Sequence, residues 1–144
     1  MSKRITFEQL LAKREQREAD KLKVGMLTIP GSDVGLEARM PPKAAVLEIY
    51  GELAAAGNAR AALLCGNHAL YTVCPQLQDR KLQEELGVAE DPMSILDTLF
   101  SVAEQDDLGG QALRFLGLLP EERAAGNTDE AESEKPVGLE TVKN

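Results

Sequence analysis

The sequence predicts a mainly α-helical fold: one small domain of five or six helices, with a single β-hairpin near the N-terminus and a disordered C-terminal tail. Three observations carry this prediction. Apolar residues recur at helical spacing through most of the chain beyond residue 42, whereas strict alternation is confined to residues 24–40. Aromatic residues are scarce, so a core of Leu, Ile, Val, Ala and Met is expected, and this composition favours helices. A length of 144 residues suits one modest core.

Residues 1–22 are predicted to form an N-terminal helical arm. Thr6 followed by Gln9 is a capping box, which marks where a helix begins. After Phe7, Leu10 and Leu11 the sequence becomes almost wholly charged, so this helix has too few apolar residues to bury a full face. Two interpretations stay open: a solvated helix held by ion pairs along its surface, or an arm that docks on a partner.

Residues 23–119 are predicted to form the core domain, which opens with the hairpin. Val24, Met26 and Thr28 alternate with Gly25, Leu27 and Ile29, the sequence PGSD makes a turn, and a second alternating run extends from Val34 to Met40. A lone hairpin is barely stable in water. We therefore expect it to pack on helices or to pair with the edge strand of another chain.

The helices of the core domain are marked by their caps and breaks. Pro41 and Pro42 precede one helix and Asn58 caps the next, which is expected to be the most buried. Their apolar positions are Val46, Leu47, Ile49, Tyr50 and Leu53 in the first, and Ala61, Leu64, Cys65, His68, Ala69 and Tyr71 to Val73 in the second.

The stretch 74–87, CPQLQDRKLQEELG, joins the two halves of the domain. Pro75 prevents the preceding helix from continuing, Asp79 is placed to cap a short new helix, and Gly87 supplies a left-handed stop.

The last two helices follow this connector. Asp91 and Pro92 predict a capped helix start, after which Met93, Ile95, Leu96, Leu99 and Phe100 are expected to face inward. A final helix is predicted over residues 102–118, with a frayed or bent start because Gly109 and Gly110 weaken it. Residues 120–144 have low hydrophobicity and many charges, which predicts a disordered acidic tail.

Charge and composition exclude several classes of protein. A net charge of −8 argues against nucleic-acid binding, which needs Lys and Arg to neutralise phosphates. Residues 1–23 carry seven basic against four acidic residues, and residues 120–144 carry three against seven, an asymmetry found in solvated ends and in ends that contact partners. No apolar run is long enough for a membrane span, and the N-terminus has no signal-peptide pattern, so a cytoplasmic protein is expected.

No catalytic or metal-binding motif is visible, so an enzyme and a bound cofactor are not expected. Cys65 and His68 could share a helical face, but nothing nearby supplies an orienting group or an oxyanion site. The acidic groups, Glu104 with Asp106 and Asp107 and Glu90 with Asp91, lack the spacing of a calcium loop and are interpreted as capping or solvated residues. Cys65 and Cys74 are expected to be reduced core thiols.

Four segments of the chain form a recognisable set: ITFEQLLAKREQREADKL, PPKAAVLEIYGEL, CPQLQDRKLQEELG and DPMSILDTLFSVAE. Within the last two, the pattern positions are Pro75, Leu77, Asp79, Leu82, Gln83, Ile95, Asp97, Leu99 and Phe100. With these segments and this order of elements, the chain resembles the XkdN-like family of phage tail assembly chaperones over residues 4–118.

The resemblance implies a helper of tail morphogenesis in the host cytoplasm that does not remain in the virion. Such a protein would bind the tape-measure protein, keep it soluble and bring tail-tube subunits to it. A structural tail subunit that stays in the particle, and a homo-oligomer, remain alternatives. A chain this small has more apolar positions than one core can hide, so partner contacts are expected at Phe7, Leu10, Leu11, Leu27 and Ile29.

Overall fold

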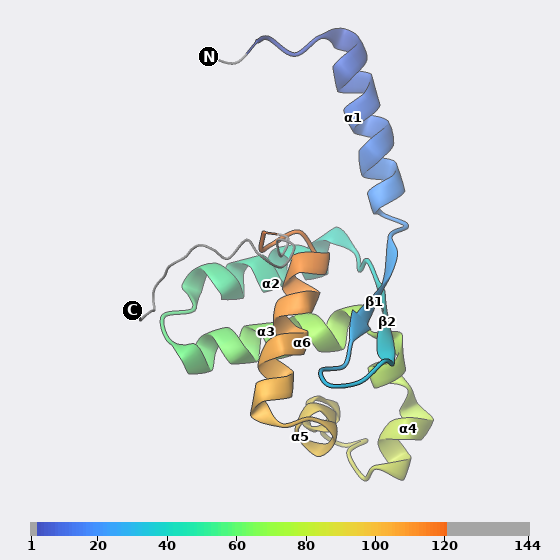
Figure 1. Ribbon diagram of the computed structural model, residues 1–144, viewed down its shortest axis with the longest axis vertical. Coiled ribbons are helices and arrows are strands. Elements are labelled where there is room, and N and C mark those ends of the chain that lie inside the picture. The colour runs from blue at the N-terminus through green and yellow to red at the C-terminus, as the bar shows by residue number, and fades with distance from the viewer. Residues whose placement is uncertain (1–2, 121–144) are drawn as a thin grey trace.

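The computed structural model describes residues 3–120 and confirms the predicted fold class: a mainly helical domain with one antiparallel hairpin near its N-terminus (Figure 1). The elements in chain order are α1 (Phe7–Asp20), β1 (Val24–Thr28), β2 (Gly35–Arg39), α2 (Lys43–Ala55), α3 (Ala59–Val73), the 3₁₀ helix η1 (Pro75–Gln78), α4 (Arg80–Glu85), the 3₁₀ helix η2 (Pro92–Ser94), α5 (Ile95–Leu99) and α6 (Val102–Phe115). The predicted disorder of the tail concerns residues that, apart from Pro120, lie outside the described part of the chain.

Helix α1 projects away from the body of the domain and buries none of its residues (Figure 1). The predicted capping box is confirmed: the backbone N–H of Gln9 donates to Thr6 Oγ1 at 3.1 Å, and the N–H of Thr6 donates to Gln9 Oε1 at 2.8 Å. Along its length only exposed ion pairs such as Arg17 with Asp20 add support. The helix therefore depends on local interactions, which stabilise a helix of this length only marginally.

The hairpin lies against the body through one face. Leu27 pairs with Leu36 in the register, and both are buried together with Ala38. Leu27 and Ile29 were predicted as partner contacts, but α6 covers the face to which the odd-numbered residues of β1 point. Leu27 is therefore only 4% exposed and Ile29 is half-buried. The apolar side chains that β1 exposes are Val24 and Met26.

The centre of the domain is the crossing of α3 and α6, the most extensive contact between two elements. Gly66 of α3 faces Gly109 of α6 so closely that a Cβ on Gly109 would lie 2.9 Å from the Cα of Gly66. The predicted frayed start of α6 is wrong. A capping box of Ser101 and Glu104 fixes the first turn, and Gly109 lies inside a continuous helix where only glycine permits the close approach.

The connector from Cys74 to Gly87 has the features that its sequence predicts. Pro75 starts a 3₁₀ turn rather than continuing α3, Asp79 Oδ1 accepts the N–H of Leu82 at 3.0 Å, and Gly87 ends α4 with φ of 76°. Gln83 is buried and its Nε2 donates to the carbonyl oxygen of Leu77 and to the hydroxyl of Tyr71, both at 2.9 Å. These residues hold the connector to α3, so they serve the scaffold.

Other predictions for the helices hold in part. Asn58 caps α3 as predicted, but Asp91 makes no side-chain capping bond at the start of η2. Ile95 and Leu96 are buried, whereas Met93 and Leu99 are exposed.

On α2, only Ile49 is buried, because this helix packs mainly against α3 and therefore buries a narrow stripe of its surface. Leu47 and Tyr50 remain exposed. The sequence predicts that α3 is the most buried helix, but α6 buries the same number of residues as α3.

Candidate functional site

Cys65 and His68, the candidates for nucleophilic or acid–base catalysis, each contact a group of α2. The thiol of Cys65 donates to the carbonyl oxygen of Ile49 at 3.6 Å, and His68 Nδ1 lies 2.9 and 3.0 Å from the two carboxylate oxygens of Glu52. Both contacts tie α3 to α2. Burial, together with the charge of Glu52, raises the pKa of Cys65, and burial alone raises the pKa of Cys74 to about 12. Both cysteines are free and remain protonated at neutral pH, which makes them poor nucleophiles.

Two acidic side chains of α6, Glu104 and Asp107, have partners within the helix or at its N-cap. Glu104 completes the capping box, as the sequence indicates, and Asp107 Oδ1 accepts a hydrogen bond from Gln111 at 2.6 Å. Within residues 3–120, no group of three or more His, Cys, Asp and Glu side chains is placed to hold a metal ion.

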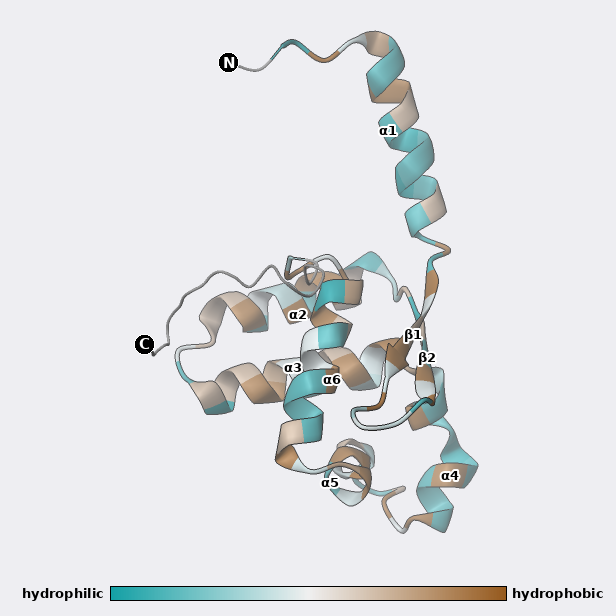
Figure 2. Cartoon of the chain, viewed as in Figure 1, coloured by the Kyte–Doolittle hydropathy of each residue, from teal (hydrophilic) through white to brown (hydrophobic). Residues whose placement is uncertain are grey.

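The N-terminal turns of α1 carry an exposed apolar surface, here called the arm patch and defined as Phe7, Leu10 and Leu11. Phe7 is 72% exposed and Leu10 is 53% exposed. Figure 2 shows this hydrophobic colouring near the start of a helix that is otherwise mostly hydrophilic. Residues three and four apart lie on the same side of a helix, so the three side chains form one surface. The arm patch is thus available to a partner.

A groove of about 850 Å³ lies where the C-terminal end of α1 approaches α2. Its apolar lining comes from Met40, Pro41, Pro42, Val46, Leu47 and Leu116. Its charged lining comes from α1 and from Lys43, and four basic side chains outnumber two acidic ones: Arg14, Arg17, Lys21 and Lys43 against Glu18 and Asp20. The groove is therefore apolar with a basic rim on a chain that is acidic as a whole.

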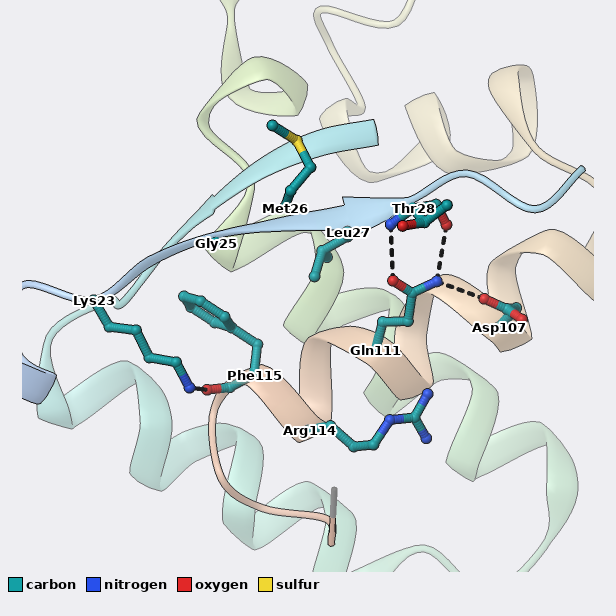
Figure 3. A pocket seen from close by; sticks show the side chains of 9 residues that line it. All are labelled: Lys23, Gly25, Met26, Leu27, Thr28, Asp107, Gln111, Arg114 and Phe115. Atoms are coloured by element: carbon teal, nitrogen blue, oxygen red, sulfur yellow. Dashed lines mark hydrogen bonds between the residues drawn. The ribbon is translucent and has the colours of Figure 1, made fainter. Parts of the chain in front are cut away.

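A second groove, of about 490 Å³, lies between the outer edge of β1 and α6 (Figure 3). Gln111 reaches from α6 to Thr28: its Nε2 donates to the carbonyl oxygen of Thr28, and the N–H of Thr28 donates to its Oε1, both at 2.8 Å. At the other end Lys23 Nζ donates to the carbonyl oxygen of Phe115 at 2.9 Å and lies 4.6 Å from the centre of its ring. These contacts fix the hairpin on α6.

The five residues that were predicted to contact a partner thus fall into two groups, one exposed and one buried or half-buried. Phe7, Leu10 and Leu11 are brought together as the arm patch, whereas Leu27 faces the core and Ile29 is half-buried. Sequence reasoning missed Val24, Met26 and Gln111. The alternation along β1 was visible, but it does not say which of its two faces a helix will cover.

No helix of residues 3–120 is long and apolar enough to cross a membrane. Comparisons of the chain with protein-family models, with curated proteins and with solved structures gave no match.

Proposed function

We propose that this protein is a phage tail assembly chaperone of the XkdN-like type, which binds the tape-measure protein and keeps it soluble during tail morphogenesis. The observation that carries the proposal is α1, a projecting helix that buries no residue and exposes the arm patch. An isolated helix of 14 residues with an apolar turn is better explained by a partner than by its own stability. The tape-measure protein is proposed as the partner because the sequence resembles this family.

The surface beside α1 suits a helical partner. The groove between α1 and α2 has an apolar lining that continues from the body onto Leu47, an exposed residue of α2. An amphipathic helix laid along such a surface buries its apolar face, which is the usual mode of helix recognition. The tape-measure protein, as the resemblance implies, offers long helices of this kind, and tail-tube subunits would then assemble around the bound protein.

The proposed role is non-enzymatic and belongs to the host cytoplasm. The thiols are buried and protonated, and His68 is held by a carboxylate, so the side chains with reactive potential support packing. The net charge of −8 helps a carrier remain soluble while it covers an apolar partner.

Co-expression with the tape-measure protein of the same gene cluster tests this proposal. We expect the wild-type chain to raise the amount of soluble tape-measure protein and to co-purify with it. The variant carrying Leu10→Ser and Leu11→Ser should lose both effects while its unfolding midpoint stays close to that of the wild type, because α1 contributes nothing to the core.

Leu64→Ser is the matched control for this experiment. Leu64 lies on α3 of the body and is 54% exposed, so the change removes about as much apolar surface as the change at Leu10 alone, which is 53% exposed, at a place away from α1. We expect this control to retain binding. Equal loss in both variants, or no gain in solubility with the wild type, would argue against the arm as the binding surface.

A structural tail subunit is the second candidate, and the outer edge of β1 favours it. This edge exposes Val24 and Met26 and could pair with a strand of a neighbouring subunit. Mass spectrometry of purified particles separates the two functions, because a subunit is present in many copies and a chaperone is absent.

A further inference from the structure

We propose that the exposed face of α2 and the groove beside it form one docking surface for an amphipathic helix whose apolar stripe is flanked by acidic residues. This inference rests on the proposed function and deepens it, because it states the chemistry that the bound segment of the partner must have. It follows from the apolar residues of α2 and from two basic side chains of the groove.

The solvent-exposed face of α2 is apolar. This face, here called the α2 face, consists of Leu47, Tyr50, Gly51 and Ala54; Leu47 is 55% exposed and Tyr50 is 56% exposed. The four residues are three or four positions apart, so they share one side of the helix, whereas Ile49 lies on the opposite side and is buried. Apolar residues on both sides are typical of a helix that is covered, so the α2 face suits a partner.

The groove beside α1 continues the α2 face. Leu47 belongs to both, because it lines the groove together with Pro42 and Val46. From there the α2 face runs towards the C-terminal end of a helix of 13 residues, which is about 20 Å long. A Cβ on Gly51 would meet no atom within 4 Å, so the space beside this residue is open. A partner helix can therefore approach α2 closely at Gly51, where no side chain keeps the two helix axes apart.

Two basic side chains of the groove have no acidic partner among the described residues. The charged lining consists of four basic and two acidic side chains. Both acidic side chains are already paired, one with Arg17 at 3.1 Å and the other with Lys21 at 3.2 Å. Arg14 and Lys43 are left without an ion pair to any residue of 3–120. A helix that carries carboxylates beside its apolar stripe complements their charge.

Charge also distinguishes this partner from a second copy of the chain. The exposed apolar helix surface that a second copy would bring is the arm patch, and residues 3–14 around it carry four basic residues against one acidic residue. In the groove these residues would lie beside Arg14 and Lys43, and like charges in contact are unfavourable. The observations therefore favour a different, acidic helix.

Two synthetic peptides test the docking surface without the tape-measure protein. Both are stapled helices of about 18 residues with the same stripe of Leu and Ala, flanked by Glu in one peptide and by Lys in the other. Their binding to the full chain is measured by fluorescence anisotropy at low and at high salt. The variants are Leu47→Ser, with Leu64→Ser as its equally exposed control, and Lys43→Glu, with Lys81→Glu as a control on the exposed surface of α4.

We expect the wild type to bind the Glu peptide about tenfold more tightly than the Lys peptide, with a smaller difference at high salt. Leu47→Ser should weaken binding of the Glu peptide about tenfold, Lys43→Glu should remove the preference for it, and both controls should behave as the wild type. Equal affinity for the two peptides, no binding of either, or equal loss in Leu47→Ser and Leu64→Ser overturns the inference. A dimer in sedimentation that Leu47→Ser abolishes also overturns it, because it assigns the α2 face to a second copy.

The co-expression experiment keeps this inference separate from the proposed function. If the wild type and Leu47→Ser raise soluble tape-measure protein equally, the α2 face is not the docking surface and the chaperone function stands. If the wild type gives no gain while the Glu peptide still binds at the α2 face, the docking surface stands and the proposed function fails.

Discussion

Replacing Gly109 by alanine should destabilise the domain, although alanine is the better helix former. Gly109 lies within α6 at the crossing with α3. A Cβ at this position would lie 2.9 Å from the Cα, 3.0 Å from the carbonyl carbon and 3.2 Å from the carbonyl oxygen of Gly66. All three atoms belong to the backbone, so neither helix can relieve the contact by turning a side chain. The two helices must move apart.

The neighbouring Gly110 provides the matched control. A Cβ there would meet only the guanidinium end of Arg114, at 3.6 Å or more, which is ordinary van der Waals contact. Replacing glycine by alanine inside a helix gains about 1 kcal/mol from propensity. At Gly110 this gain should appear almost in full. At Gly109 an overpacking cost of about 1–3 kcal/mol opposes it, and we expect a net loss because the clash is with backbone.

Thermal and urea unfolding, followed by circular dichroism, measure both variants. The gain from helix propensity is common to both variants, so the difference between Gly110→Ala and Gly109→Ala equals the overpacking cost. This cost of about 1–3 kcal/mol corresponds to roughly 4–24 °C in Tm for a domain of this size. Gly66→Ala should fall between them, because its Cβ would lie 3.2 Å from Gly109. If Gly109→Ala is as stable as Gly110→Ala, the close crossing of α3 and α6 is wrong.

Two further predictions concern Cys74 and Thr6. Because the pKa of Cys74 is raised from 9.0 to about 12, its contribution to stability is complete below about pH 9. Between pH 9 and 12 the unfolding free energy should fall by roughly 1 kcal/mol per pH unit from this group, and Cys74→Ser should flatten the slope; an equal slope would contradict the assignment. Thr6→Ala removes the cap of α1, worth about 1 kcal/mol, so amide exchange in residues 7–10 should quicken while Tm stays unchanged. A lower Tm would mean that α1 packs on the body.

Local signals in the sequence predicted much of the fold. The capping box at Thr6, the cap at Asp79 and the stop at Gly87 are confirmed because each depends on residues within one turn of the chain. The hairpin followed from alternation and a turn sequence, which are equally local.

Features that depend on distant residues could not be predicted in the same way. The glycine pair in α6 suggested a weak helix, since nothing near Gly109 reveals that Gly66 will lie against it. The alternation along β1 left its buried face undecided, and α6 decides it through the contact of Phe115 with Gly25. For the candidate site, the arm patch was predictable from apolar residues followed by a charged run, whereas the bond from Gln111 to Thr28 joins residues that no sequence pattern links.

The most direct test of the proposed function is amide hydrogen exchange across the whole chain, free and bound to the tape-measure protein. Free α1 should exchange quickly, because it makes only local contacts. On binding, residues 7–11 should become strongly protected, together with the start of α2 that lines the adjoining groove. Protection confined to α3, α5 and α6, with α1 still exchanging as in the free protein, would contradict the assignment of the arm as the chaperone's binding surface.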